Sequence, residues 1–336
     1  MATLKLSIAV EKLALAAPFR ISGFVFEEQD AVVATLSDGV HQGRGEASGV
    51  YYLGDTAQSM VAAIESKRGA IEAGIDRATL QQLLPPGGAR NAIDCALWEL
   101  DAYRAGVAVW QLAGLPPPKP LITTFTLGAD DPATMAAGAR KYAQARALKL
   151  KLTGDLDLDV ARVRAVRAAR PGVWVGVDAN QGYTIDALEP LLAALVEAGV
   201  SLLEQPLRRG AEADLDGFAS TIPIAADESA LSLTDLAGLV GRFNVVNIKL
   251  DKCGGLTEGL AMAREARRLG LQVMVGNMVG SSLAMAPAFV LGQLCDVVDL
   301  DGPIFLVRDR VPGITYVDGR AWSGEEVWGA THAVAA

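Results

Sequence analysis

The chain has 336 residues, 51% of them hydrophobic, and a formal net charge of −9. A chain of this length can bury a large core and is expected to form more than one structural unit. It contains no run rich in Lys or Arg, so nucleic acids and anionic membrane surfaces are not expected as partners. The three cysteines, Cys95, Cys253 and Cys295, form no CxxC pair and are typical of reduced thiols in a cytoplasmic protein.

The N-terminal part of the sequence predicts an α+β unit over residues 1–118. Residues 1–36 contain the alternating run LKLSIAV and the β-branched run AVVATL, which favour strands. Asp38-Gly39 is a turn signal between AVVATL and the following GRGEA segment. Residues 55–115 are rich in Ala, Leu, Glu and Gln and favour helices. Pro116–Pro118 then mark a boundary.

The central part, residues 119–303, alternates between short apolar runs and helical stretches rich in Ala, Arg and Leu. Eight such runs joined by seven helices predict a (β/α)7β barrel, a modified TIM barrel of the α/β class. The strand candidates are 121–127, 147–152, 173–180, 201–206, 222–229, 245–250, 271–277 and 297–303. The stretch 269–295 is uncharged and long enough to span a bilayer, but its Gly, Asn and Pro residues favour a strand, a loop and a buried helix.

The last part, residues 304–336, contains strand-like pieces and Gly/Pro turns. We expect it to return to the N-terminal unit. The predicted architecture is therefore a barrel with an α+β capping domain that is formed by both ends of the chain.

Charged residues end the predicted barrel strands at a nearly constant step. They are Lys151, Asp178, Glu204, Asp227, Lys249 and Asp299. The first four intervals are 27, 26, 23 and 22 residues, and the last, 50 residues, spans two steps. One step is the length of a strand, a helix and two short loops. Because barrel enzymes build their active sites at the carboxyl ends of the strands, the spacing predicts one site at the barrel mouth.

Three of these residues, Asp178, Glu204 and Asp227, are carboxylates on consecutive predicted strands. Without His or Cys nearby, converging carboxylates suit a hard divalent cation, and Mg²⁺ is favoured over Zn²⁺. The alternative is that each carboxylate pairs with a local Lys or Arg. Three carboxylates in register would repel one another without a cation, which disfavours this alternative.

Lys151 and Lys249 fall on the second and sixth predicted strands, which are opposed in an eight-stranded barrel. Two amines in these positions could act on opposite faces of a substrate carbon. A lysine base must be neutral near pH 7, and a nearby Mg²⁺ and a second ammonium would both lower its pKa. Residues two apart on a strand share a face, so Lys149 joins Lys151, and Asp301 joins Asp299. Lys252 lies just past the sixth strand. For this residue, the alternative to a catalytic role is that it only balances the charge of the carboxylates.

Six motifs carry a resemblance to a known family. They are KLK at 149–151, VDAN at 177–180, LEQP at 203–206, ADES at 226–229, NIKLDKCGG at 247–255 and DLDGP at 299–303. Together they resemble the enolase superfamily, in its muconate-lactonizing subgroup, and within it the dipeptide epimerases of the Ala-Glu type. The resemblance covers essentially the whole chain, and DxD at the eighth strand separates these epimerases from cycloisomerases and synthases.

The resemblance implies an isomerase that acts on amino acid derivatives. Mg²⁺, held by the three carboxylates, would bind the terminal carboxylate of a dipeptide. One of Lys151 and Lys249 would remove the α-proton, giving an enediolate, and the other would return a proton to the opposite face. Asp299 and Asp301 would hold the free α-ammonium. The other substrate-binding positions that we predict here are Lys149 and, in the GNMVGSS loop, Asn277 and Met278.

The chain departs from this pattern in the loop after the first strand. Glu-selective epimerases of this type carry Arg there, whereas no Arg lies between Ser22 and Glu28. An apolar loop does not compensate the desolvation of a side-chain carboxylate. We therefore predict a hydrophobic or broader dipeptide preference, with Phe24 and Phe26 as pocket walls. The alternative is that both phenylalanines only pack the core of the cap.

Other functions use the same residues. Muconate or chloromuconate cycloisomerases and o-succinylbenzoate synthases share the lysines and the metal, but their substrates carry no ammonium for Asp299 and Asp301. A Schiff-base aldolase would use Lys151 or Lys249 as the nucleophile without a metal. A binding module without catalysis is disfavoured by the complete set of charges. The sequence is compatible with a homo-oligomer and does not define its size.

Overall fold

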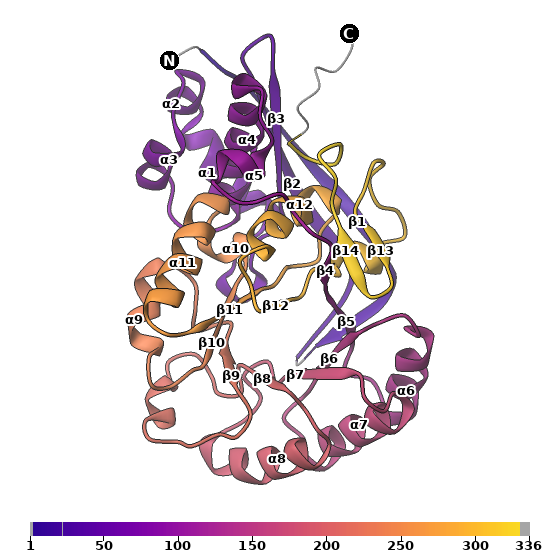
Figure 1. Cartoon of the computed structure of the whole chain (residues 1–336). Helices are drawn as coiled ribbons and strands as arrows, with labels where there is room; N and C mark the ends of the chain where they lie inside the picture. Colours follow the sequence, from indigo (N-terminus) through magenta and orange to yellow (C-terminus); the bar gives the residue numbers. More distant parts are fainter. Residues whose placement is uncertain (1–2, 22, 330–336) are drawn as a thin grey trace.

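The computed structural model describes residues 3–21 and 23–329, and the side chain of Phe24 lies outside this description. It contains an N-terminal cap, a barrel and a C-terminal segment that contacts both (Figure 1). A long hairpin of β1 (Lys5–Ile21) and β2 (Phe24–Ser37) runs from the cap toward the barrel. Near its tip, the backbone N–H of Ala129, after the first barrel strand, donates to Arg20 O at 3.0 Å. The hairpin therefore reaches the mouth of the barrel.

The cap combines a three-stranded antiparallel sheet with helices. β3 (Gln42–Ala47) pairs with β2 after the predicted Asp38-Gly39 turn. The helices are α1 (Ala57–Ser66), α2 (Arg68–Glu72), α3 (Arg77–Leu83), α4 (Gly88–Ala105) and α5 (Val109–Leu112). Leu36 of the sheet and Ile93 and Leu97 of α4 are buried in one apolar core. The strands and helices predicted for this region are thus confirmed.

The sheet and α4 approach closely at two glycines of β3. A Cβ at Gly43 would lie 2.1 Å from Ala96 O, and a Cβ at Gly45 would lie 2.1 Å from Ala92 O. Both distances are far shorter than any van der Waals contact, so only glycine permits this packing. Arg44, between the two, forms an ion pair with the buried Glu99, with Nη2 2.7 Å from Oε1.

We expect Gly45→Ala to lower the free energy of unfolding by about 1–3 kcal/mol or more, because the added methyl group must push α4 off the sheet. Urea denaturation followed by circular dichroism measures this change. Gly69→Ala in α2 is the matched control, since its Cβ meets no atom within 4 Å. It should instead stabilise the protein by up to about 1 kcal/mol through helix propensity. Equal stability of Gly45→Ala and wild type would contradict the close approach.

The barrel is a sheet of eight parallel strands that neighbour one another in chain order. They are β5 (Thr124–Leu127), β6 (Ala147–Lys151), β7 (Trp174–Asp178), β8 (Leu202–Glu204), β9 (Ile224–Ala226), β10 (Val245–Ile248), β11 (Gln272–Val275) and β12 (Val297–Val298). The connecting helices are α6 (Pro132–Lys141), α7 (Leu156–Ala169), α8 (Ile185–Glu197), α9 (Leu236–Leu239), α10 (Leu250–Cys253), α11 (Leu256–Arg268) and α12 (Ser282–Gly292). The predicted barrel with a separate cap is confirmed.

The first predicted barrel strand, 121–127, is divided at Thr123. β4 (Leu121–Ile122) leaves the barrel and joins a small sheet with β13 (Thr315–Val317) and β14 (Arg320–Trp322). The hydroxyl oxygen of Thr123 accepts a hydrogen bond from the Leu300 N–H at 2.9 Å, which links the chain before β5 to the segment after β12. This contact between the two ends of the barrel sheet fixes the change of direction.

The prediction of a helix between β8 and β9 is wrong. The described connection forms only a 3-10 turn, Glu212–Leu215. Gly210 and Gly217 on either side have φ values of +95° and +77°, a left-handed conformation that ends a right-handed helix. The segment between them is too short for several α-helical turns.

The described part of the C-terminal segment, residues 304–329, contacts the cap, and residues 330–336 of the predicted segment lie outside the described residues. After β14, Arg44 Nη2 donates to Val327 O at 3.0 Å, and Trp328 Nε1 donates to Arg44 O at 2.9 Å. The uncharged stretch 269–295 forms β11, a loop and α12, as expected. Among the described residues, no helix has both the length and the apolar character that crossing a membrane requires.

Candidate active site

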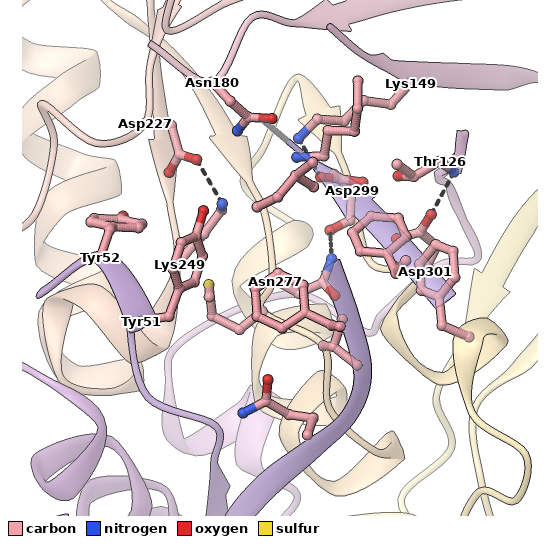
Figure 2. A pocket seen from close by; sticks show the side chains of 18 of the residues that line it. Tyr51, Tyr52, Thr126, Lys149, Asn180, Asp227, Lys249, Asn277, Asp299 and Asp301 are labelled. Carbon is pink, nitrogen blue, oxygen red and sulfur yellow. Dashed lines mark hydrogen bonds and ion pairs between the residues drawn. The ribbon is translucent and has the colours of Figure 1, made fainter. Parts of the chain in front are cut away.

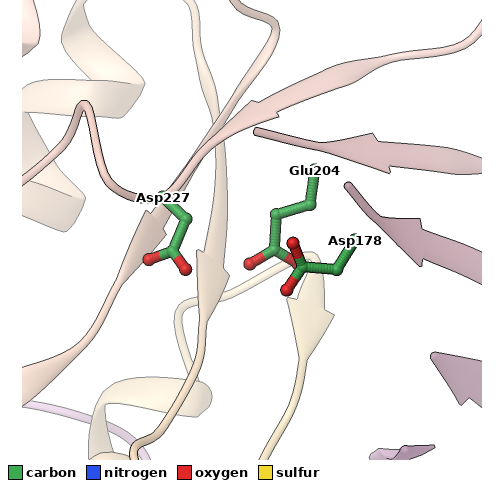
Figure 3. Close-up of side chains that lie close together, drawn as sticks. All are labelled: Asp178, Glu204 and Asp227. Atoms are coloured by element: carbon green, nitrogen blue, oxygen red, sulfur yellow. The ribbon is translucent and has the colours of Figure 1, made fainter. Parts of the chain in front are cut away.

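Three carboxylates from neighbouring strands meet at the barrel mouth (Figure 3). Asp178 ends β7, Glu204 ends β8, and Asp227 directly follows β9. One oxygen from each lies within 4.8 Å of the others, and no residue of the three is more than 1% exposed. Asp178 and Glu204 are direct neighbours in the parallel register of β7 and β8. The structure thus brings together the carboxylates that the spacing selected.

Each of the three carboxylates also contacts a lysine, as the alternative of local charge pairing expects, yet two carboxyl groups here keep raised pKa values. Burial and the Asp178 carboxylate raise the pKa of Glu204 to about 7. Burial and Asp227 raise the pKa of the adjacent Glu228 to about 8. A buried, oxygen-only donor set in which one carboxyl tends to keep its proton fits a hard divalent cation such as Mg²⁺.

Lys151 and Lys249 flank the carboxylates from opposite sides. Lys151 ends β6 and Lys249 directly follows β10, the second and sixth of the eight strands. Lys151 Nζ lies 2.5 Å from Asp178 Oδ2. Lys249 Nζ lies 2.6 Å from Asp227 Oδ2 (Figure 2). Both lysines line the same cavity. Two amines therefore face one space from two sides.

The carboxylates keep Lys249 charged. Burial is the largest influence and acts to lower its pKa, but the Asp227, Glu204 and Asp178 carboxylates together outweigh it, and the pKa lies above the ordinary value for lysine. A divalent cation that neutralised the Asp227 charge would remove this stabilisation and lower the pKa of Lys249, as a lysine base requires.

Lys149 occupies the centre of the charge network. Its Nζ lies 2.7 Å from Glu204 Oε2, 2.9 Å from Asp299 Oδ2 and 3.3 Å from Asp178 Oδ2, and the residue is 3% exposed. Its contacts favour charge balance between the carboxylate cluster and Asp299. The substrate-binding role remains a prediction.

Asp299 and Asp301 follow β12 and face the first barrel strand. Asp299 Oδ1 accepts from Thr124 Oγ1 at 2.5 Å. Asp301 Oδ2 accepts from the Thr126 N–H at 2.6 Å (Figure 2). Burial and the Asp299 carboxylate raise the pKa of Asp301 to about 7. Within the described part of the chain, Asp301 has no ion-pair partner. An incoming ammonium would supply the missing charge.

One cavity lies above these charges. Phe26, Asn277 and Met278 line it, at positions that the sequence analysis selected. Asn277 Nδ2 donates to Asp299 O at 2.5 Å, and the Phe26 ring lies 5.3 Å from the Tyr51 ring. The side chain of Phe24, also predicted to be a pocket wall, lies outside the described residues.

The sequence analysis missed several residues of the site. They are Phe19, Ile21, Gln29, Tyr51, Tyr52, Thr124, Thr126 and Asn180. Thr124 and Thr126 alternate on β5 as Lys149 and Lys151 do on β6, and this pattern could have identified them. The cap residues have no comparable sequence signal. Lys252, considered for charge balance, lies with Nζ 2.5 Å from Asp227 Oδ1 and is 1% exposed.

Comparison with known proteins decides the family. Residues 3–114 match the mandelate racemase / muconate lactonizing enzyme N-terminal domain, and residues 133–300 match the enolase C-terminal domain-like family. This chain belongs to the enolase superfamily. The resemblance seen in its motifs is thereby confirmed.

Several superfamily members are similar over nearly the whole chain. The L-Ala-D/L-Glu epimerase of Escherichia coli (strain K12) is 39% identical over 302 residues, 90% of this chain and 94% of that protein. The N-acetyl-D-glutamate racemase of Pseudoalteromonas sp is 41% identical over 253 residues, 74% of this chain and 78% of that protein. An enolase family member from Agrobacterium tumefaciens with homology to dipeptide epimerases, solved with bound sodium and L-Ala-L-Glu, is 42% identical with a TM-score of 0.94 and covers 97% of this chain and 100% of its own.

A dipeptide epimerase from Methylococcus capsulatus, complexed with Mg and the dipeptide L-Arg-D-Lys, has the same fold. It is 32% identical with a TM-score of 0.89 and covers 96% of this chain and 97% of its own. The fold and the location of the barrel mouth are thus shared with proteins solved with metal and dipeptide.

Proposed function

We propose that this protein is a Mg²⁺-dependent dipeptide epimerase that inverts the α-carbon of the C-terminal residue of an L,L or L,D dipeptide. The observation that carries the proposal is the placement of Lys151 and Lys249 on either side of a buried carboxylate cluster. Similarity to proteins named epimerases and racemases supports an isomerase acting on amino acid derivatives. The free cysteines support a cytoplasmic location.

The two lysines perform the proton transfers. The substrate α-carbon lies between the two Nζ atoms, one amine removes its proton, and the other delivers a proton to the opposite face. Which lysine acts first depends on the isomer supplied. Asp178, Glu204 and Asp227 would hold Mg²⁺, which, when bound, supplies positive charge to stabilise the negative charge that develops on the substrate carboxylate.

The aspartates after β12 distinguish this reaction from its alternatives. Asp301 lies beside Asp299 without an ion-pair partner among the described residues, so it can receive the α-ammonium of a dipeptide. Substrates of cycloisomerases and o-succinylbenzoate synthases carry no ammonium, and an anion is repelled by two buried carboxyl groups. A dipeptide, with a carboxylate at one end and an ammonium at the other, matches both ends of the site.

The proposal predicts that a free dipeptide such as L-Ala-L-Leu exchanges its C-terminal α-proton with D2O in the presence of Mg²⁺. The N-acetylated dipeptide lacks the ammonium and should react at least about tenfold more slowly. Asp301→Asn should raise KM for the free dipeptide by about tenfold or more while leaving Mg²⁺ affinity unchanged. NMR of the α-proton and calorimetric Mg²⁺ titration measure these effects.

The pH dependence provides a control for this assignment. Asp301 binds an ammonium only when ionised, and its raised pKa means that the ionised form is lost as the pH falls through about 7. The KM for the free dipeptide should therefore increase below this pH in the wild type, and this dependence should disappear in Asp301→Asn. Equal rates for free and N-acetylated dipeptides would favour an N-acylamino acid racemase, and equal loss of dipeptide and Mg²⁺ binding would assign Asp301 to the metal.

A further inference from the structure

The site leaves a single direction for the side chain of the residue that is inverted. In the proposed reaction, Lys151 and Lys249 occupy the two faces of the α-carbon, so its other three substituents lie between the lysines. The carboxylate points to the cluster at β7, β8 and β9, and the amide nitrogen points toward Asp299 and Asp301 at β12. The remaining substituent, the side chain, points out of the barrel mouth toward the cap.

The cap wall of the cavity carries no charge among its described residues. It consists of Phe19, Ile21, Phe26, Gln29, Tyr51 and Tyr52. A side chain that reaches this wall therefore meets mainly aromatic and aliphatic groups.

The two cations of the described hairpin that lie nearest its tip in sequence, Arg20 and Lys12, contact carboxylates outside the cavity. Arg20 alternates with the cavity-lining Phe19 and Ile21 on β1, and its Nη1 lies 3.9 Å from Asp130 Oδ1 on the barrel rim. Lys12 forms an ion pair with Glu28, with Nζ 2.6 Å from Oε1. The cavity lysines are engaged in the same way, since each has a carboxylate oxygen within 2.7 Å.

The polar group of Gln29 is also committed. Its Nε2 donates to Asp30 O and to Ser48 O, both at 3.0 Å, so both amide hydrogens are used. The remaining polar atom of the Gln29 side chain is its carbonyl oxygen, which is a hydrogen-bond acceptor. An incoming side-chain carboxylate would find an acceptor there and no donor.

We infer that this site selects dipeptides whose C-terminal residue has an uncharged, apolar or aromatic side chain, and that it rejects glutamate and aspartate at that position. The inference rests on the proposed function and narrows its substrate class. A carboxylate buried against this wall would meet neutral hydroxyl donors such as Tyr52 but no cation among the described wall residues, so its charge stays uncompensated. An apolar side chain instead gains contact with Phe26 and its neighbour Tyr51. The Agrobacterium tumefaciens relative was solved with L-Ala-L-Glu, so overall similarity alone points the other way.

The decisive experiment compares kcat/KM for L-Ala-L-Leu, L-Ala-L-Phe and L-Ala-L-Glu with the full chain and Mg²⁺. We expect kcat/KM for the first two dipeptides to exceed that for L-Ala-L-Glu by about 100-fold or more, because the glutamate carboxylate would be buried without a cation beside it. A preference for L-Ala-L-Glu would overturn the inference and leave the epimerase proposal intact. A lack of exchange with every dipeptide would overturn the proposed function itself.

Two variants test the wall directly. Phe26→Arg places a cation on it and should raise the ratio of L-Ala-L-Glu to L-Ala-L-Leu turnover by about tenfold or more, whereas Phe26→Leu should keep the wild-type ratio. Arg20→Ala is the matched control, because Arg20 is directed away from the cavity and its loss should leave the ratio unchanged. A selective loss of L-Ala-L-Glu turnover in Arg20→Ala would show that Arg20 reaches the substrate and would overturn the inference.

Discussion

Replacement of either Lys151 or Lys249 by alanine should reduce epimerisation by more than about 1000-fold, because each variant removes the group that acts on one face of the α-carbon. Epimerisation requires both faces, so neither lysine can substitute for the other. Conversion of L-Ala-L-Leu to L-Ala-D-Leu, followed by chiral chromatography, measures the loss. Lys141→Ala, an exposed lysine of α6, is the control and should retain full activity.

Isotope exchange separates the two lysines. Each alanine variant keeps one base, so it should still exchange the α-proton of one isomer with D2O and fail with the other isomer. Lys249→Arg keeps the positive charge next to Asp227 but cannot act as a base near neutral pH, and it should be as inactive as the alanine variant. If either single variant still produced a mixture of both isomers, the two-base reaction would be ruled out.

Removal of the divalent cation is expected to have the second large effect. Chelation with EDTA should reduce activity by more than about 100-fold, with recovery on addition of Mg²⁺, because the divalent cation would stabilise the negative charge that develops on the substrate carboxylate. Glu204→Gln should weaken Mg²⁺ binding in calorimetry and abolish the rise in melting temperature that Mg²⁺ gives the wild type. Glu189→Gln, on the exposed face of α8, should change neither quantity.

The same treatment excludes a different chemistry. A Schiff-base aldolase on this barrel would survive chelation and would be trapped covalently by borohydride through Lys151 or Lys249. We expect no trapping, since both amines are held by carboxylates that suit a metal site. Activity that persists in EDTA together with borohydride trapping would overturn the assignment of the three carboxylates.

The sequence by itself determined the barrel and the positions of its main charges. A parallel strand followed by a helix consumes a nearly fixed number of residues, so a polar residue at each strand end appears at a regular interval. The register of the sheet then converts sequence spacing into contact. Lys151 lies opposite Asp178, and Asp178 lies opposite Glu204, as direct neighbours in adjacent strands. Local chain geometry was therefore enough to predict which charges meet.

Apart from Phe26, which the sequence analysis predicted, the described residues of the substrate-facing wall were decided only by the tertiary structure. Gln29 on β2, and Tyr51 and Tyr52 in the 3-10 turn after β3, belong to the cap and line the same cavity as the residues of the barrel mouth. The fit of the cap sheet on α4 depends on Gly43 and Gly45, whose role is visible only when both elements are in place. No periodicity relates residues in separate units, since their contact depends on how two surfaces pack and not on the distance along one chain. For this reason the sequence predicts the residues that transfer the proton, and the structure shows the cavity wall that the side chain of the substrate residue would contact.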